Sequence, residues 1–417
     1  MGLFEHFPYT NFHELNLSWL LWKMKELETN AENIRDIVDE WLKAHPEVFP
    51  FVTPQMYGAV GDGLHDDTTA FQDALEAGVD IMVPTDAGQD YLITGTLIVK
   101  NNGLKRIYGT GEAWRGPSTD GAIHFHPASG STQILFQLQD GHQGFGLFNL
   151  RLALGDGNGN NSGVALSSTG GAVDKDITID RVQFVNATLA IDFVGRGLKC
   201  SNCEFNSGTM GVAINWPAGQ TDSYGSRSIG FENCRFHSIV PTAIEVQSGH
   251  AYGLRVVNCW ADHGIRCLVR AKTKAINWTI EGNAMQEATA AGSTNRYMIE
   301  FQDGARSCNV SGNNLRGSSL NLVRITGGDV QYCAFNNNVA EVANDLITFV
   351  GTNTVEYNAI VGNVAELASG YAVLRISNPN GVPTHFVVTG NVTNQKTRLG
   401  TAPTYSVVAD NVDVDTT

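Results

Sequence analysis

Basic residues are scarce in this chain of 417 residues, and its formal net charge is −15. Binding to a nucleic-acid backbone needs clustered Lys and Arg, so the charge argues against a nucleic-acid partner. Charged residues of both signs make up only 17% of the chain, whereas glycine is abundant at 45 residues. This balance is typical of a turn-rich β protein rather than a helical or disordered one.

Long hydrophobic runs are also missing. The apolar run from Leu17 to Trp22 is too short to cross a bilayer, and no basic stretch followed by an apolar run indicates a secretory signal. We therefore expect no membrane insertion, and synthesis in a cytoplasm. Among seven cysteines the only close pair is Cys200 and Cys203, which does not complete a zinc site. We therefore predict no metal and no cofactor, and motifs of serine hydrolases, zinc proteases and nucleotide-binding proteins are absent.

The first 45 residues predict a helical stalk. Apolar or small residues recur in alternating steps of three and four, which is typical of a coiled coil, and Pro46 and Pro50 would end the helix. A single amphipathic helix packed on its own domain is the alternative. The stripe consists of Leu17, Leu20, Met24, Leu27, Ala31, Ile34, Val38 and Trp41. Bulky aromatic residues before and within it indicate a docking patch for another protein, namely Phe4, Phe7, Tyr9, Phe12, Trp19 and Trp22.

An asparagine followed by a short apolar step recurs through the second half of the chain. The spacing varies from 20 to 31 residues, which is typical of a solenoid whose loops absorb the variation in length. We therefore predict a mainly β fold, a single-stranded right-handed parallel β-helix with coils of roughly 25 residues. The series opens at Arg181 and continues at Asn202, Asn233, Asn258, Asn283, Asn313, Asn338, Asn363, Asn391 and Asn411.

The repeat also predicts which side chains point inward. Equivalent residues of neighbouring coils lie one strand spacing apart, so the asparagines are expected to stack at a turn. Cys308 and Cys333 should stack as well. A charge at Val364 is then expected to be destabilising, whereas one at Thr348 is expected to be tolerated. The residues after the repeat position are expected inside, namely Val182, Cys203, Cys234, Cys259, Ala284, Val339, Val364, Val392 and Val412.

A second strand follows most repeat positions, and its alternation places one polar column outside. Asp192, Glu245 and Glu300 are the catalytic candidates, because residues two coils apart are separated by about 9–10 Å. That distance is near the top of the range of about 6.5–9.5 Å for the acid and base of inverting glycoside hydrolases. Glu245 is the favoured general acid, and a simple polar face is the alternative. The expected column is Asp192, Asn215, Glu245, an apolar coil, Glu300, Arg324, Thr348 and Arg375.

Aromatic residues near two long loops, 217–227 and 287–296, are candidates for sugar binding, although each could instead cover the apolar core. Polar groups flank the same coils and offer a further place for chemistry. The substrate-binding candidates are Trp216, Tyr224, Tyr252, Trp260, Asp262 and His263.

Residues 56–75, MYGAVGDGLHDDTTAFQDAL, combine a glycine-rich turn with a helix expected from about Thr68 to Ala77, capped by Asp66 or Asp67. This segment resembles the N-terminal segment of the pectate-lyase-like superfamily, found in many phage tailspikes and in some polysaccharide-cleaving enzymes. In that family it caps the open end of the β-helix. The resemblance therefore implies that Asp62, His65 and the two capping acids are structural rather than catalytic.

Together these features resemble a phage receptor-binding appendage, a tailspike or tail fibre. We expect a docking patch and stalk at 1–45, a cap and first coils at 46–175 and a regular β-helix at 176–417. The resemblance implies a homotrimer that joins other virion proteins through its N-terminal segment, is made in the host cytoplasm, and binds, and in some members cleaves, host surface polysaccharide. The alternatives are a structural virion fibre without glycan cleavage and a free polysaccharide lyase or hydrolase.

Overall fold

The structure is a computed structural model, which describes residues 51–85, 89–100, 105–110, 122–127, 132–139, 144–155, 161–168, 174–215, 228–249, 252–286, 296–352, 354–367, 371–377, 384–393, 407–409 and 412–413. The predicted docking patch and coiled-coil stalk, residues 1–45, lie outside these ranges. Within the described ranges, no helix is both long enough and apolar enough to cross a membrane.

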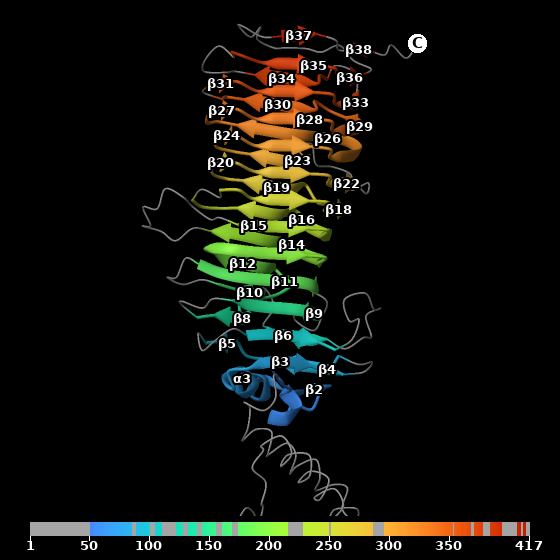
Figure 1. Ribbon diagram of the computed structural model, residues 1–417. Helices are drawn as coiled ribbons and strands as arrows, with labels where there is room; N and C mark the ends of the chain where they lie inside the picture. The colour runs from blue at the N-terminus through green and yellow to red at the C-terminus, as the bar shows by residue number, and fades with distance from the viewer. Residues whose placement is uncertain are drawn as a thin grey trace, which may run out of the picture.

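The described chain is a parallel β-solenoid, which confirms the predicted mainly β fold (Figure 1). Strands stack along one axis, from the blue N-terminal cap with α3 to the red C-terminal coils. Each complete coil contributes one strand to each of three faces, and every strand pairs in parallel with the strands one coil before and after it. The residues that point inward form one continuous apolar core along the axis.

The first face contains β1 (Phe51–Val52), β3 (Asp80–Val83), β6 (Lys105–Gly109), the first parts of β9 (Phe145–Leu154) and β11 (Asp174–Val185), β13 (Arg196–Ser201), β15 (Ile229–Glu232), β17 (Arg255–Val257), β21 (Thr279–Glu281), β25 (Asn309–Ser311), β28 (Ala334–Asn336), β32 (Ala359–Val361), β35 (Val387–Thr389) and β37 (Val407–Ala409). The second face contains β2 (Asp62–Asp66), β4 (Asp90–Ile93), β7 (Ile123–Phe125), the second parts of β9 and β11, the first parts of β14 (Glu204–Asn215) and β16 (Arg235–Val246), β18 (Trp260–Asp262), β22 (Ala284–Gln286), the first part of β26 (Asn314–Thr326), β29 (Val339–Ala343), β33 (Val364–Leu367), β36 (Val392–Thr393) and β38 (Val412–Asp413).

The third face contains β5 (Leu97–Val99), β8 (Ile134–Leu138), β10 (Val164–Ser167), β12 (Leu189–Val194), the second parts of β14 and β16, β19 (Cys267–Ala271), β23 (Arg296–Phe301), the second part of β26, β30 (Ile347–Val350) and β34 (Leu374–Ser377). A short separate sheet precedes the first face in four coils and contains β20 (Ala275–Ile276), β24 (Ala305–Arg306), β27 (Val330–Gln331) and β31 (Val355–Glu356).

The cap consists of a short 3-10 helix, Pro54–Tyr57, and α3, Thr68–Glu76, where the sequence predicted a helix. The carboxylate of Asp67 is buried and accepts the backbone N–H groups of Val60 at 2.7 Å and Gly61 at 3.2 Å. The carboxylate of Asp66 accepts the backbone N–H of Thr68, the first residue of α3, at 3.0 Å. Both acids hold backbone in place, which gives them a structural role.

The inner corner between the first and second faces carries the repeat. Asn202, Asn233 and Asn258 adopt left-handed backbone conformations at this corner, and a buried cysteine follows each of them. In later coils a residue such as Gly282 takes the left-handed position, and the repeat asparagine after it is buried. The backbone N–H of Cys259 donates to Asn283 Oδ1 at 2.8 Å, so the cysteines and the later asparagines form one inner column.

This one-residue shift corrects part of the predicted register. Val339 and Val364 are exposed, at 43% and 46%, and Ala284 and Val392 are half-buried, because each lies between the buried asparagine and the next inward residue. Thr348, in contrast, is only 8% exposed. The expected contrast between a tolerant Thr348 and an intolerant Val364 is therefore wrong. The inward positions predicted for Val182, Cys203, Cys234 and Cys259 are confirmed.

The five later asparagines form a hydrogen-bonded ladder through the interior. Each Nδ2 donates to the Oδ1 of the next asparagine, with distances of 3.0, 2.9, 2.9 and 2.8 Å from Asn283 to Asn391. Each of the four accepting Oδ1 atoms also takes the backbone N–H of the preceding asparagine, and each Nδ2 also donates to a backbone carbonyl. Burial of these amides is tolerated because their partners replace the lost water.

The other inner corner repeats this arrangement on a smaller scale. Cys308 and Cys333 occupy one column there, as predicted, and the backbone N–H of Cys333 donates to Asn358 Oδ1 at 3.0 Å. All seven cysteines are buried as free thiols. Burial raises the pKa of the Cys267 thiol to about 12, so this cysteine serves as a small apolar side chain.

Two adjacent asparagines provide a test of the ladder. Asn338→Leu has nearly the same volume but removes the acceptor of the Asn313 backbone N–H and one hydrogen bond each from Asn313 Nδ2, Asn363 Oδ1 and a backbone carbonyl. At about 1–3 kcal/mol for each unsatisfied group, we expect a loss of at least about 3 kcal/mol in the free energy of unfolding. Asn337→Gly should change it by less than about 1 kcal/mol, because Asn337 has a φ of 53° that glycine adopts freely. Equal denaturant midpoints for the two variants would contradict the assigned register.

Candidate functional site

The third face carries the predicted outer column. Asp192, Glu245 and Glu300 lie in this single column, each two coils from the next, as their spacing predicted. The column runs through Ser167, Asp192, Ala213, Glu245, Arg270, Glu300, Arg324, Thr348 and Arg375.

Two members of the column differ from the prediction. Ala213, not Asn215, lies between Asp192 and Glu245, because the strand is in register two residues earlier than expected. The coil between Glu245 and Glu300 is not apolar at this position but carries Arg270. The sequence contains a signal for this arginine, since it alternates with inward Val269 as the glutamates alternate with their neighbours.

Arg270 binds both glutamates. Its Nε donates to Glu300 Oε2 at 2.7 Å, and its Nη1 donates to Glu245 Oε2 at 3.2 Å. Lys272 Nζ lies 2.7 Å from the other oxygen of Glu245. The two glutamates are only 2% and 6% exposed, so they form a covered ion-pair chain. Both oxygens of Glu245 are therefore held by cationic side chains, an arrangement that argues against Glu245 as the general acid.

Asp192 has different surroundings. Burial raises the pKa of its carboxyl, although a hydrogen bond from Asn215 Nδ2 at 3.2 Å opposes the shift. The structure describes no cation in contact with it. Of the three acids in the column, Asp192 therefore best fits a group that retains a proton.

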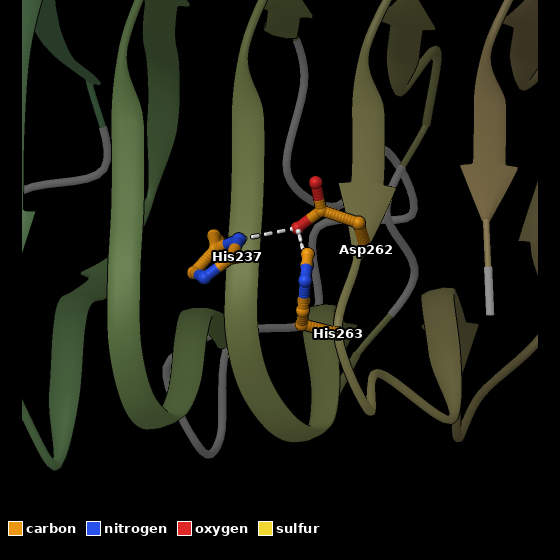
Figure 2. Close-up of side chains that lie close together, drawn as sticks. All are labelled: His237, Asp262 and His263. Carbon is orange, nitrogen blue, oxygen red and sulfur yellow. Dashed lines mark hydrogen bonds and ion pairs between the residues drawn. The ribbon is translucent and has the colours of Figure 1, made fainter. Parts of the chain in front are cut away.

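A second cluster lies where the second face ends, and Figure 2 shows its three ionisable side chains. Asp262 is the last residue of β18, and His237, its register partner, lies in the first part of β16. His263 follows Asp262 directly at the corner. His237 Nδ1 lies 2.6 Å from Asp262 Oδ1, and His263 Nδ1 lies 3.1 Å from the same oxygen. The two imidazole rings are 4.3 Å apart between centroids.

The other oxygen of Asp262 is held separately. Arg235 Nη2 donates to Oδ2 at 3.1 Å, and Trp260 Nε1 donates to it at 3.0 Å. Burial would raise the pKa of this carboxyl, but the hydrogen bonds from His263, Arg235, His237 and Trp260 outweigh it and lower the pKa. Asp262 is therefore a buried anion that fixes four side chains around it.

A small hollow of about 110 Å³ adjoins this cluster on the second face. It exists because Ala284, with its short side chain, stands between Trp260 and Asn314 in one outer column. Trp260 is 40% exposed and forms one wall. The hollow is lined by Trp260, Ala284, Met285, Gln286, Asn314 and Arg316.

Sequence reasoning found half of this site. Trp260, Asp262 and His263 come together, whereas Tyr252 pairs with Ile276 at the corner before the first face. Trp216 and Tyr224 lie outside the described residues. His237 was missed, although the segments Arg235–His237 and Trp260–Asp262 stand in corresponding places of neighbouring coils.

No protein-family model matches the sequence. Over 220 residues the chain is 26% identical to the pre-neck appendage protein of Bacillus phage B103, a match that covers 50% of this chain and 22% of the phage protein. The chain thus spans about a fifth of the length of this relative. The match confirms the predicted resemblance to a phage appendage protein.

Solved structures with similar coordinates are β-solenoid proteins of low sequence identity. The surface adhesin PfbA of Streptococcus pneumoniae has a TM-score of 0.48 at 14% identity, over 87% of this chain and 100% of that chain. Tailspike protein 3 of bacteriophage CBA120 has a TM-score of 0.43 at 15% identity, over 88% of this chain and 61% of the tailspike chain.

Proposed function

We propose that this chain is a phage virion appendage that binds host surface polysaccharide through the hollow beside Trp260. The match to the pre-neck appendage protein supports the virion role. The half-exposed indole beside polar side chains supports glycan binding, because sugars pack their apolar C–H faces on aromatic rings while their hydroxyl groups need hydrogen-bond partners. Gln286, Asn314 and Arg316 would supply those partners.

Replacement of Trp260 tests this proposal. Trp260→Ala should weaken binding to glycan about tenfold or more, since loss of a well-packed aromatic anchor commonly costs about 2 kcal/mol. Binding would be measured by cosedimentation with purified cell walls, starting with those of Bacillus species.

Tyr332→Ala is the matched control, because Tyr332 is also an exposed aromatic residue, at 51%, but lies at another corner. It should bind like the unaltered protein. Equal binding by both variants would place the glycan site elsewhere.

We extend the proposal to assembly. Residues 1–45 form a coiled-coil stalk and docking patch, the β-helix is right-handed, its cap and first coils occupy 46–175 and its regular coils 176–417, and three chains associate. The exposed Val339 and Val364, in register on the second face, are apolar surface that contact with another chain would cover.

Light scattering should give the mass of three chains for residues 1–417. Val364→Asp should weaken association without unfolding the coils, because this side chain is 46% exposed. A monomer mass for the unaltered chain would refute the trimer.

Depolymerisation of the glycan is a second candidate function, favoured by the three acids in register on the third face. The surroundings move the general-acid role from Glu245 to Asp192, whose pKa is raised. Glu245, held by Arg270 and Lys272, would act as the base for water. Glu300 would hold Arg270 in position. A distance of about 9–10 Å across two coils is near that of an inverting hydrolase.

Asp192→Asn should abolish release of oligosaccharide while leaving glycan binding unchanged. In the unaltered protein, the rate should fall as pH rises through the raised pKa of Asp192, because the general acid then loses its proton. Reducing-end release over a pH series measures both effects. Asp345→Asn, which alters another buried acid of raised pKa in a different coil, should retain activity. Full activity in Asp192→Asn would remove this residue from the mechanism.

A further inference from the structure

Two imidazoles and one carboxylate converge at the corner after β18, and their ligand atoms all lie within 4.8 Å of one another (Figure 2). We propose that His237 Nδ1, His263 Nδ1 and Asp262 Oδ1 bind one divalent transition-metal ion such as Zn²⁺. The proposal departs from the expectation of no metal that the cysteine pattern suggested. It stands on this geometry and does not depend on glycan binding.

The ligand set favours a transition metal over Mg²⁺ or Ca²⁺. Imidazole nitrogen suits Zn²⁺, Ni²⁺ and Cu²⁺, whereas Mg²⁺ and Ca²⁺ prefer oxygen ligands. Ligand atoms about 2.0–2.2 Å from a shared Zn²⁺ lie roughly 3 Å from each other. The distances of 2.6 and 3.1 Å from Asp262 Oδ1 to the two Nδ1 atoms are close to that separation. The ion therefore requires only small shifts of the side chains.

The two oxygens of Asp262 have separate partners. One oxygen can therefore bind a metal ion while the other keeps its hydrogen bonds. Arg235 and Trp260 both contact Oδ2, so the carboxylate is oriented and its buried side is satisfied. Among the described residues, only the two imidazoles contact Oδ1. Outer contacts of this kind orient a metal ligand and raise metal affinity. Both histidines would bind the ion as Nε2–H tautomers.

The backbone offers no other reason for an imidazole at position 263. The corner needs a left-handed residue, and three preceding coils place Asn186, Ser207 and Ser238 there, with φ of 57°, 55° and 54°. His263 adopts the same conformation at 54° with a larger side chain. Its side chain is 53% exposed and that of His237 is 27% exposed, so solvent reaches the site and water could complete the coordination. Three protein ligands and an open side resemble the zinc sites that accept an exogenous ligand.

The test uses the full chain without an affinity tag, treated with a chelator and then titrated with Zn²⁺ in a calorimeter. Co²⁺, whose visible absorption reports nitrogen and oxygen ligands, is the second probe. His263→Gly removes one ligand and keeps the left-handed corner. It should lower the affinity of this site roughly 100-fold or more, because loss of an outer-shell partner alone costs about 10–100-fold.

His65→Ala is the matched control, since the exposed His65 also lies beside an aspartate, with its Nδ1 3.2 Å from Asp62 Oδ2. Among the described residues, no second histidine joins this pair in a possible metal site. It should retain the site, with the affinity and the Co²⁺ spectrum of the unaltered protein. Any weak binding of zinc at other histidines is common to both variants, so the difference between the two variants is the readout.

Equal melting temperatures without metal would show that both variants fold. The proposal is overturned if His263→Gly binds Zn²⁺ with unchanged stoichiometry and affinity. It is equally overturned if the unaltered protein binds neither Zn²⁺ nor Co²⁺, in which case the cluster is a hydrogen-bonded network alone.

Discussion

The pairing of each strand with the strands one coil before and one coil after it is the constraint on which the rest of this structure depends. Parallel neighbours lie about 4.8 Å apart, so a side chain contacts its equivalents in adjacent coils more closely than most other residues. The side chain at each position of a coil must therefore pack against the side chains at the same position of the neighbouring coils. Phe184, Phe205 and Phe236 illustrate this in the core, where their rings stack at 5.0 and 4.7 Å with interplanar angles of 12° and 9°.

The same constraint gives the two candidate sites their form. On the third face, like charges would repel along a column, and Arg270 between Glu245 and Glu300 gives the column alternating charge. At the end of the second face, His237 and Asp262 are neighbours only because their strands are in register, although 25 residues separate them in the sequence. Sites in this fold are thus built from residues of neighbouring coils, on a backbone that the hydrogen bonds of the coils hold in place.

The fold could be predicted because solenoid repeats leave a direct trace in the sequence. The alternation of inward and outward side chains along the third face was predictable. Ile191, Val212 and Ile244 point inward, and the residue after each of them lies in the outer column. The register at the first inner corner was not. A glycine such as Gly282 can take the left-handed position that Asn258 takes one coil earlier. The repeated asparagine is then a turn residue in one coil and a core residue in the next, although the sequence shows the same residue type in both. Hydrogen bonding decides between the two roles, and no single-coil pattern contains it.

The site was predictable only in part for a related reason. Trp260, Asp262 and His263 are close in sequence, so their proximity could be anticipated, whereas Arg235 and His237 belong to the coil before. The ion pairs of Glu245 depend on Arg270, which looks like one polar residue in an apolar strand until the strands are aligned. A one-residue error in register is enough to hide such partners.

The ladder of asparagines also determines how this molecule can vary in length. Between Asn313 and Asn338 the chain completes one full coil, and the strands on either side present the same columns to their neighbours. Removal or duplication of such a coil joins surfaces that already match, whereas removal of one strand residue misaligns the columns of that strand up to the next loop or bulge. A protein with this fold can therefore become longer or shorter by whole coils while the residue columns of its core stay the same.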